Sequence, residues 1–354
     1  MLVTLARSGH LAPNTSQQFA VCFEGRLSRE LHEAGARVDV LGDVRLSRPS
    51  TVARARRSLS EVLERQHFDL VICHMPWTLA IFGKPIKAAK QRVGLWAHAL
   101  HDGKHWMERL ARTAPDIAIA NSRYTEAGLA RWFPDIQRGV VYPPVALDSF
   151  PQSSSSSSTL RRELGADDAT TVIIQVSRME SGKGQITHLK ALGQLKDLPS
   201  RWTCWMVGGA QRPEEQQYID ELRLLAGELG LTDRVLFLGQ RGDVRELLRA
   251  ADIFCQPNET PDSFGISYIE AMWAGLPVVT SAIGGALEIV DESCGFLAPA
   301  GDIAGFADRL RRLIENPDLR AALTAKSKER ALELCNPATQ IKLLSDISRG
   351  STAC

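Results

Sequence analysis

Two positively charged residues follow one predicted strand of this chain, at the point where a helix is expected to begin. The segment from Val176 to Leu192 reads VSRMESGKGQITHLKAL, with Arg178 at the end of the strand and Lys183-Gly184 at the helix start. Two cations beside free backbone N–H groups suit a diphosphate, and they would stabilise negative charge growing on a departing nucleotide. The segment is not a Walker A loop, because G-x-x-x-x-G-K-[ST] is absent. An arginine and a lysine five residues apart also fit a solvated surface, and their position after a strand favours binding.

Two carboxylates lie eight residues apart in a second segment, Gln256 to Val290. Its sequence is QPNETPDSFGISYIEAMWAGLPVVTSAIGGALEIV, in which Phe264-Gly265 opens a helix that closes at the glycine before LPVV. Eight helical residues rise about 12 Å. That span is the right order to place one carboxylate near a hexose and the other near a ribose of the same nucleotide sugar. The alternative is that Asp262 only caps the helix and Glu270 is only solvated, but the complete DSFG, EAM and PVV string favours binding.

These loops need strands and helices to hold them, and apolar runs alternate with amphipathic stretches along both halves of the chain. Strands are expected at Leu2–Leu5, Arg37–Leu41, Leu70–Cys73, Val93–Ala97, Ile117–Ala120 and Val140–Tyr142, then at Thr171–Val176, Thr203–Val207, Val235–Leu238, Ile253–Cys255, Pro277–Thr280 and Gly295–Ala298. Helices are expected at Gln17–Ala34 and Trp106–Ala114, then at Gly184–Lys196, Pro213–Leu229, Val244–Ala250, Ile266–Ala274, Ile303–Glu315 and Pro317–Leu334. This alternation predicts an α/β fold of two doubly wound Rossmann-like domains facing each other across a cleft. Ligands are expected at the carboxyl ends of the strands.

A run of six serines divides the chain. The segment Pro151–Thr159 reads PQSSSSSST and is typical of a flexible linker. The expected organisation is an N-terminal acceptor-side domain over 1–150, a Ser-rich linker over 151–170 and a nucleotide-sugar domain over 171–335. Residues 336–354 are expected to form a C-terminal helix that returns to the N-terminal domain, followed by a frayed tail.

The composition excludes several classes of protein. The chain has 354 residues, a net charge of +1, 44% hydrophobic and 23% charged residues, which are ordinary globular values. A near-neutral total argues against a nucleic-acid partner. Seven cysteines without a C-x-x-C pair indicate neither a zinc site nor a disulfide framework, and no metal ligands are expected. Without a signal peptide or an apolar run long enough to span a membrane, the expected location is the cytoplasm.

Charge is unevenly shared between the halves. Residues 1–150 carry 20 basic and 14 acidic side chains, whereas the remainder carries 22 and 27. Two interpretations of the basic excess in the first half are open. Either it reflects chance and solvated helix faces, or the first half meets an anionic partner. Basic residues gather at Arg54–Arg57 and at Lys84–Arg92, so peripheral contact with the inner face of an anionic membrane is a weaker hypothesis.

The second half resembles the retaining glycosyltransferases of family 4, which have the GT-B fold. Their donor domains carry a strand-R-x4-K-G-helix element, then E-x-F-G-x5-E-A-M-x-x-G-x-P-V-V, then G-G-x-x-E. The matching positions here are Arg178, Lys183-Gly184, Asp262, Phe264-Gly265, Glu270, Met272, Gly275, Pro277, Gly284-Gly285 and Glu288. WMVGGA near 205–210 and RVLFLGQRGDVRELLRAADIFCQP from Arg234 also match. The first half resembles the family more loosely, in LWAHALHDG near 95–103 and PDIAIANSRYT from Pro115.

The resemblance implies a role for each matching position. Arg178 and Lys183 would hold the diphosphate and assist its departure, Asp262 would meet the donor sugar and Glu270 would accept hydrogen bonds from the ribose. His98, just after a strand, matches the histidine that the family places near the donor sugar and β-phosphate; His101 and His105 are close competitors. Catalytic candidates are thus His98, Arg178, Lys183 and Asp262, and the donor-binding set adds Gly9, Gly239, Arg241, Phe264, Gly265, Ile266 and Glu270. Gly284 and Gly285 are expected to serve tight backbone packing.

Two positions depart from the family pattern. Asp262 stands where the family usually has glutamate, and Glu259 could substitute for it if the loop bulges. The glycine-rich loop that normally follows the first strand is replaced by SGHLAPNTSQQ, with only Gly9.

The resemblance implies retaining transfer from a nucleotide diphosphate sugar, with a UDP-sugar as the expected donor and no required cofactor. The acceptor would be a glycan, a lipid-linked molecule or a small molecule. The alternatives are a nucleotide-sugar epimerase of the same fold and a non-catalytic nucleotide-sugar-binding protein.

Overall fold

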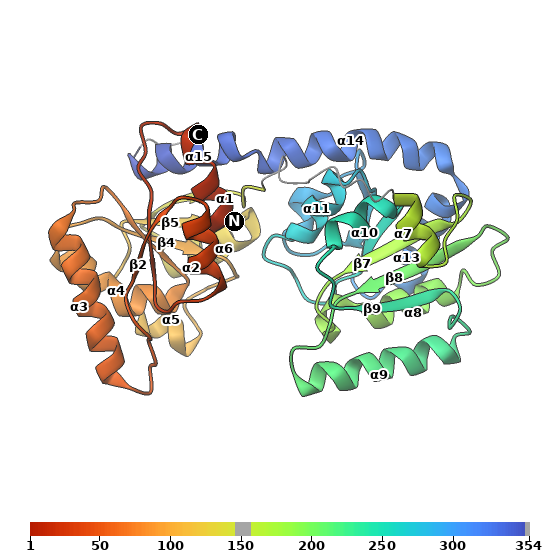
Figure 1. Ribbon diagram of the computed structural model, residues 1–354, viewed down its shortest axis with the longest axis horizontal. Coiled ribbons are helices and arrows are strands. Elements are labelled where there is room, and N and C mark those ends of the chain that lie inside the picture. The colour runs from red at the N-terminus through yellow and green to blue at the C-terminus, as the bar shows by residue number, and fades with distance from the viewer. Residues whose placement is uncertain (146–156, 351–354) are drawn as a thin grey trace. The chain divides into compact units, whose positions relative to one another are not determined.

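The computed structural model describes residues 1–145 and 157–350. The chain divides into two compact units, Met1–Ala146 with Cys335–Cys354 and Leu147–Leu334. We call them the N-terminal unit and the C-terminal unit. Each contains parallel strands linked by helices (Figure 1).

The C-terminal unit is built on one six-stranded parallel sheet. Its strands are β7 (Thr171–Val176), β8 (Trp202–Val207), β9 (Val235–Gly239), β10 (Ile253–Gln256), β11 (Val278–Ser281) and β12 (Gly295–Ala298). Its helices are α7 (Ser157–Glu163), η3 (Ser181–Lys183), α8 (Gln185–Gly193), α9 (Pro213–Glu228), α10 (Val244–Ala250), α11 (Ile266–Trp273), α12 (Ala286–Ile289), α13 (Ile303–Glu315) and α14 (Pro317–Cys335). The strands are apolar on both faces because helices cover both sides of the sheet.

The strand order of this sheet reverses beside its first strand. The order is β12-β11-β10-β7-β8-β9, so β7 lies between β8 and β10. The connections after β7 and after β10 therefore leave on opposite sides, and the loops at the carboxyl ends of these two strands flank an opening at the switch point. This is where a doubly wound sheet binds its ligand.

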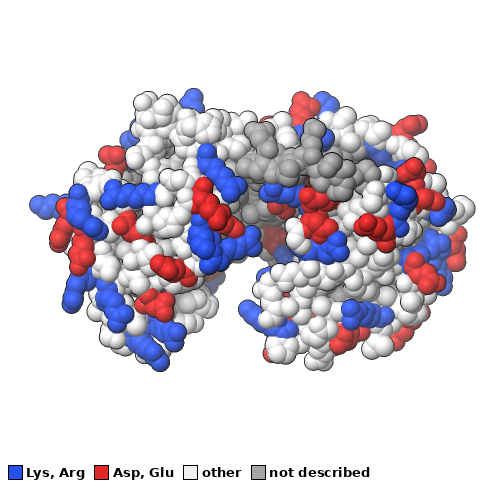
Figure 2. All heavy atoms as spheres, in the orientation of Figure 1, with Lys and Arg blue, Asp and Glu red and all other residues white. Residues whose placement is uncertain are grey.

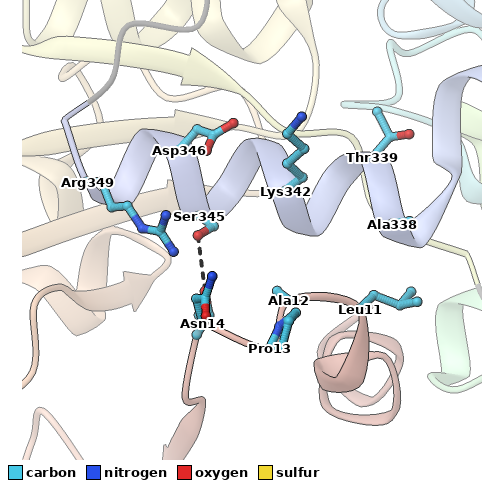
Figure 3. A pocket seen from close by; sticks show the side chains of 11 residues that line it. Leu11, Ala12, Pro13, Asn14, Ala338, Thr339, Lys342, Ser345, Asp346 and Arg349 are labelled. Atoms are coloured by element: carbon cyan, nitrogen blue, oxygen red, sulfur yellow. Dashed lines mark hydrogen bonds between the residues drawn. The ribbon is translucent and has the colours of Figure 1, made fainter.

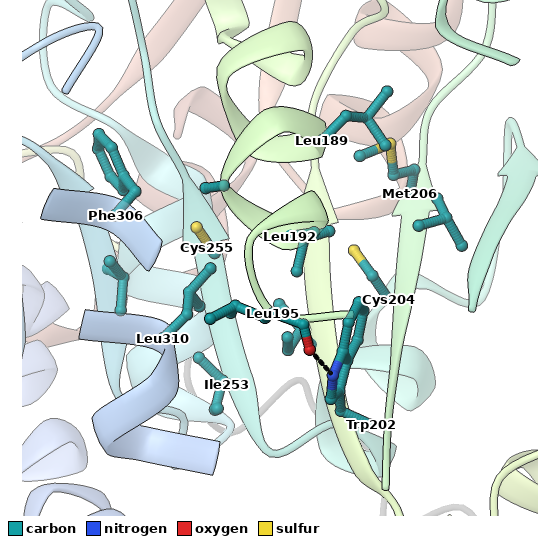
Figure 4. Packing of buried hydrophobic residues seen from close by; sticks show 14 of the residues in the cluster. Leu189, Leu192, Leu195, Trp202, Cys204, Met206, Ile253, Cys255, Phe306 and Leu310 are labelled. Carbon is teal, nitrogen blue, oxygen red and sulfur yellow. Dashed lines mark hydrogen bonds between the residues drawn. The ribbon is translucent and has the colours of Figure 1, made fainter. Parts of the chain in front are cut away.

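One face of the sheet forms the main core of this unit. Leu189 and Leu192 of α8 and Phe306 and Leu310 of α13 pack against alternate residues of the strands, including Cys204, Met206, Ile253 and Cys255 (Figure 4). The indole of Trp202 donates to the carbonyl oxygen of Leu195 at 3.1 Å, which satisfies its buried N–H. On the other face, the ring of Tyr268 from α11 meets Phe254 of β10 edge to face. Both site loops are thus anchored by buried strands.

The N-terminal unit contains two parallel sheets. One pairs β1 (Gln18–Val21) with β2 (Arg37–Val40), and the other has the order β3-β4-β5-β6, with β3 (Val71–His74), β4 (Val93–Ala97), β5 (Ile117–Ala120) and β6 (Gln137–Val140). Its helices are α1 (Leu2–Arg7), η1 (Gly9–Leu11), α2 (Arg26–Glu33), α3 (Pro49–Arg65), α4 (Pro76–Ala88), α5 (Trp106–Leu110), α6 (Arg123–Trp132) and α15 (Pro337–Ser348). Helices α1 and α15 cover one face, where Leu5 and Ile341 join Trp96 and Ile119 in a buried cluster.

Several sequence predictions are wrong in this half of the chain. Leu2–Leu5 is the start of helix α1, not a strand, because a four-residue apolar run fits either element and packing against α15 selects the helix. Gln17–Ala34 begins with strand β1, and only its second part is helical. The last strand ends at Val140 instead of beginning there.

The structure describes residues 157–170 of the predicted Ser-rich linker. Residues 151–156 lie outside the described part of the chain, as do 351–354 of the expected tail, whereas Ser157–Glu163 forms helix α7 within the predicted linker. Arg161 of α7 donates to the carbonyl oxygen of Ala250 at 2.8 Å and pairs with Asp252 at 3.0 Å. These contacts hold α7 on the C-terminal unit.

Candidate functional site

The loop after β7 brings a lysine into the switch region of the C-terminal sheet. The chain leaves β7 at Val176, makes the short η3 turn that ends at Lys183, and enters α8 through Gly184. Gly184 has φ +68°, and a Cβ on it would lie 1.7 Å from the carbonyl oxygen of Pro257. Only glycine fits this close approach of two backbones. The loop after β7 is therefore locked against the loop after β10.

The locked loops place Lys183 against Asp262. The Lys183 ammonium group pairs with Oδ1 of Asp262, and the two side chains are 17% and 24% exposed. These exposures leave the pair reachable from solvent at the carboxyl edge of the sheet. The structure thus joins two predicted site residues that lie 79 positions apart in the sequence.

A buried polar cluster holds Asp262 from behind. Asn258 donates to Oδ2 of Asp262 at 2.7 Å and to the hydroxyl of Tyr268 at 2.9 Å, while Gln256 donates to Oδ1 of Asn258 at 2.9 Å. The hydroxyl of Thr280 lies 3.1 Å from that of Tyr268. All four supporting side chains are buried. Asp262 is therefore fixed by hydrogen bonds as well as by its ion pair.

These supporting residues were not among the predicted site residues. Gln256 and Asn258 come at the end of a predicted apolar strand, where parallel sheets place functional side chains. Two amide side chains at the end of a strand could therefore have identified Gln256 and Asn258 as candidate site residues. Tyr268 and Thr280 carried no such signal, because a tyrosine and a threonine in apolar segments look like ordinary core residues.

The backbone of Lys183 has a buried support of its own. The amide of Gln175 donates to the carbonyl oxygen of Lys183 at 2.9 Å, and its oxygen lies 2.8 Å from Nδ1 of His188. Burial lowers the pKa of His188 to about 3, so this imidazole is neutral near pH 7. Because the oxygen of Gln175 is an acceptor, Nδ1 of His188 must carry the proton.

The remaining predicted residues of this unit take different positions. Arg178 is half-exposed and its guanidinium donates to Glu180 at 2.9 Å. Burial raises the pKa of Glu270 on α11, and the nearby Arg245 acts in the opposite direction. Phe264 is 1% exposed, so its ring lies in the core of the unit. Ile266 is exposed at the first turn of α11.

Strand β9 ends at Gly239 and Arg241 follows in the next loop, and both residues belong to the expected donor-binding set. Arg241 makes two hydrogen bonds to Asp243, at 2.8 and 2.6 Å. This bidentate pair fixes the guanidinium plane beside the end of the strand.

Glu259 does not take the place of Asp262. Its carboxylate accepts a hydrogen bond from the hydroxyl of Thr187 at 2.7 Å, so it faces α8. Gly284 and Gly285 serve backbone packing as expected: a Cβ on Gly284 would lie 2.4 Å from the carbonyl oxygen of Asp262. The residue after Gly284 also donates its N–H to that oxygen, at 2.9 Å.

In the N-terminal unit, His98 lies just beyond the end of β4. Its Nε2 is 2.8 Å from Nδ1 of His74, which ends the neighbouring strand β3. The competing histidines have local structural partners: Nδ1 of His101 lies 2.7 Å from Glu108, and Nδ1 of His105 accepts the N–H of Met107 at 3.3 Å at the start of α5.

Gly9 lies in the η1 turn, which packs against α15. The same region holds a cavity of about 430 Å³ lined by residues 11–15, by one side of α15 including Lys342 and Asp346, and by Arg349 just after that helix (Figure 3). The hydroxyls of Thr15 and Ser345 meet across it at 3.0 Å. None of the predicted site residues lines this cavity.

The basic segments of the N-terminal unit have partly structural uses. Arg56 donates through Nε to the carbonyl oxygen of Ile81 at 2.8 Å. That carbonyl lacks a helical partner because Pro85, four residues later in α4, has no N–H. Lys87 pairs with Asp116 and Arg92 donates to the carbonyl of Ser348. Three of the seven cations are therefore engaged within the unit.

Other cations of these segments remain exposed among acidic side chains. Arg54, Arg57, Lys84 and Lys90 are exposed, and red acidic side chains lie among the blue ones on the visible surface over α3 (Figure 2). Across residues 1–145 and 157–350, no helix is long and apolar enough to cross a membrane. The same residues contain no group of three or more histidine, cysteine, aspartate or glutamate side chains placed to hold a metal ion.

Comparisons with known proteins agree with the expected class. Residues 156–330 match the family model described as glycosyl transferases group 1. The D-inositol 3-phosphate glycosyltransferase of Corynebacterium jeikeium is 35% identical over 189 residues, which are 52% of this chain and 45% of that protein. The GDP-mannose-dependent alpha-(1-6)-phosphatidylinositol monomannoside mannosyltransferase of Mycolicibacterium smegmatis is 28% identical over 309 residues, or 81% of this chain and 77% of that protein. The chain spans about half the length of the first curated relatives that it matches, 45% of one and 52% of another.

Solved structures confirm the predicted fold class. The Anabaena protein HepE in complex with UDP-glucose superimposes with a TM-score of 0.81 at 25% identity, over 98% of this chain and 94% of that one. The chain therefore has an α/β fold of the GT-B type, built from Rossmann-like units, as the sequence predicted.

Proposed function

We propose that this chain is a retaining glycosyltransferase that moves a hexose from a UDP-sugar to a hydroxyl group of a glycan, lipid-linked or small-molecule acceptor. The observation that supports this most directly is the Lys183–Asp262 pair at the switch point of the C-terminal sheet. It lies within the part of the chain that matches the glycosyl transferases group 1 model. A cation held in place at the carboxyl edge of a doubly wound sheet suits a diphosphate.

Lys183 and Arg178 are the proposed electrostatic partners of the leaving nucleotide. In the reaction, the bond between the anomeric carbon and the diphosphate oxygen breaks, and the acceptor oxygen forms the new bond on the same face. The acceptor proton passes to a phosphate oxygen of the leaving group. Negative charge grows on the diphosphate as the bond breaks, so a lysine already oriented by Asp262 and Asn258 stabilises the transition state without reorganising.

The carboxylates have separate proposed roles. Asp262 orients the Lys183 ammonium group and faces the donor sugar, while Glu270 accepts hydrogen bonds from the ribose hydroxyls. Burial raises the pKa of Glu270, and hydrogen-bond donors from a ribose would favour its charged form. Backbone atoms of Gly265 and the exposed start of α11 complete the donor side.

The names of related proteins guide the choice of substrates. One curated relative is named for GDP-mannose and phosphatidylinositol mannoside, another for inositol phosphate, and one structural neighbour was solved with UDP-glucose. We propose UDP-sugars as the donors for this chain, and inositol-containing polyols belong in the first acceptor panel. GDP-mannose is the competing donor that the experiment must separate.

The direct test measures nucleotide release. Purified protein is incubated with UDP-glucose, UDP-galactose, UDP-N-acetylglucosamine or GDP-mannose, with and without each acceptor. Acceptor-dependent release of UDP is expected. Lys183→Ala should lose about 100-fold or more in kcat/KM, whereas Lys190→Ala, an exposed position on the following helix α8, should match wild type. Glu270→Gln should raise the KM for the donor.

Each part of the proposal has its own refuting result. Equal turnover in wild type and Lys183→Ala would refute the diphosphate role. Release of GDP alone would replace the donor assignment, and donor conversion without dependence on any acceptor would refute transfer. Retention is checked by the proton coupling at the anomeric position of the isolated product, and an inverted product would refute that part.

We further propose that the N-terminal unit contacts the inner face of an anionic membrane peripherally. The exposed cations Arg54, Arg57, Lys84 and Lys90 support this proposal. Co-sedimentation with phosphatidylglycerol vesicles at low salt is expected, and replacing these four residues by glutamine should abolish it. No binding of wild type at low salt would refute it.

A further inference from the structure

Three ring side chains share one face of the larger sheet in the N-terminal unit. His74 of β3 is the register partner of Trp96 of β4, so both side chains point to the same face. His98 is two residues beyond Trp96 and therefore continues on that face. His74 and His98 thus meet at the carboxyl edge of the sheet. Trp96 beside them is part of the buried cluster under α1 and α15.

The two imidazoles form one hydrogen bond with nearly coplanar rings. Nδ1 of His74 lies 2.8 Å from Nε2 of His98, and the ring planes differ by 3°. Trp96 stacks near both rings, with centroids 5.5 Å from His74 and 5.7 Å from His98. Burial lowers the pKa of His74 to about 3 and that of His98 to about 4. Both rings are neutral near pH 7, so one nitrogen donates and the other accepts.

This bond leaves a single ring nitrogen of His98 for any ligand. With Nε2 engaged by His74, Nδ1 is the remaining nitrogen. If Nε2 donated, Nδ1 would present a lone pair, which repels phosphate and other acceptor oxygens. If His74 donates instead, Nδ1 of His98 carries the proton and can donate. The direction of one internal hydrogen bond therefore decides whether His98 can bind an anion.

We propose that His74 is a positioning residue that donates from Nδ1 to Nε2 of His98 and so fixes His98 as the Nδ1–H tautomer. The proposal rests on the proposed glycosyl transfer in one respect: the N–H that His98 then presents would face the donor sugar or its β-phosphate. His74 itself does not touch the substrate. Its contribution is to hold the ring plane and the proton of its neighbour.

The backbone beside His74 supports a specialised role for this corner. Met75 has φ +80° and ψ +149°, a region that side chains other than glycine rarely occupy. The strained turn is held by the hydroxyl of Thr78, 2.7 Å from the carbonyl oxygens of both His74 and Met75. It ends β3 abruptly and starts α4 at Pro76, which leaves the His74 ring at the strand end beside His98.

The first test observes the tautomer directly and does not depend on activity. The ¹⁵N chemical shifts of the histidine side chains at neutral pH distinguish a protonated from an unprotonated ring nitrogen, and a His98→Gln variant identifies the His98 signals. Wild type should show Nδ1 protonated and Nε2 unprotonated in His98. The reverse pattern in wild type would overturn the proposal whatever the enzyme catalyses.

The second test uses two substitutions at position 74. Asparagine can place an amide N–H near the original Nδ1, whereas phenylalanine keeps the ring without a donor. His74→Phe should shift His98 toward the Nε2–H tautomer and lower kcat/KM for nucleotide release roughly tenfold, and His74→Asn should restore most of both. Because His98→Gln removes the group that His74 positions, His74→Phe should have little further effect in that background.

The outcomes separate this inference from the proposed function. A wild-type Nδ1–H tautomer without turnover of any nucleotide sugar would refute glycosyl transfer and leave the positioning role intact. A shifted tautomer in His74→Phe with unchanged kcat/KM would refute the positioning role alone. The wild-type ¹⁵N pattern decides the hydrogen-bond direction even if His74→Phe does not fold.

Discussion

His188 should make the stability of the C-terminal unit depend on pH in a way that one substitution removes. It is the only histidine in that unit, it is fully buried, and burial lowers its pKa from 6.5 to about 3. When the pH falls below 6.5, the unfolded chain takes up a proton at this imidazole and the folded unit does not. The unfolded state is then favoured, so stability present at neutral pH is lost as the pH falls.

The size of this effect follows from the two pKa values. Below the unfolded pKa and above the folded one, the free energy of unfolding falls by about 1.36 kcal/mol per pH unit. From the unfolded pKa of 6.5 to about pH 5, the expected loss is roughly 2 kcal/mol. Carboxylates also change the free energy of unfolding in this pH range. The prediction therefore concerns the difference between wild type and a variant without the imidazole.

The matched variant is His188→Asn. Its amide can donate to the oxygen of Gln175 as Nδ1 does, but it does not titrate. Hydrogen exchange of peptides from β7 and β10, corrected for the intrinsic effect of pH, reports the opening free energy of this unit alone. Between pH 6.5 and 5, wild type should lose about 2 kcal/mol more than His188→Asn. Equal slopes for the two proteins would refute the argument that the buried imidazole stays neutral.

Three further predictions test the packing around the site and the N-terminal helices. Gly230 has φ +71° and no atom within 4 Å of a new Cβ, so Gly230→Ala should lower the free energy of unfolding by about 1–2 kcal/mol. Gly184→Ala should lower it by more than about 4 kcal/mol, because its Cβ meets a backbone oxygen. Equal losses in denaturant unfolding would contradict the clash at Gly184. Arg56→Ala should lower the free energy of unfolding by about 1–3 kcal/mol. In a Pro85→Ala background, which restores the helical N–H, the same substitution should lower it by less than about 1 kcal/mol. An equal loss in both backgrounds would rule out the contact of Arg56 with the carbonyl oxygen. Asn258→Ala should destabilise the C-terminal unit by about 2–4 kcal/mol and lower kcat/KM about tenfold, and full activity with intact stability would show that Asp262 needs no support from behind.

The sequence predicted the parts of the site that depend on position along one strand or helix. Lys183 and Asp262 were both expected at strand-to-helix loops, and they meet because those loops follow adjacent strands of a parallel sheet. The strands of the C-terminal half were predicted well because each is buried on both faces and is too short for a helix.

Residues that act across elements were harder to find. The pairing of His74 with His98 depends on the register of two strands and on a strained turn at Met75, and neither is visible in a single sequence. Leu2–Leu5 was wrongly predicted as a strand for a related reason. Its apolar run fits both element types, and only packing against α15, more than 300 residues later, selects the helix.

Buried neutral groups hold the charged or donating side chains in both units. Asn258 holds the carboxylate of Asp262, Gln175 holds the backbone of Lys183, and the neutral imidazole of His74 meets His98. A buried charge in any of these supporting positions would cost more desolvation energy. Amides and neutral imidazoles fix geometry without adding a charge beside the side chains that they hold. Substitutions in the supporting layer should therefore alter reactivity through orientation, with the charge of the site unchanged.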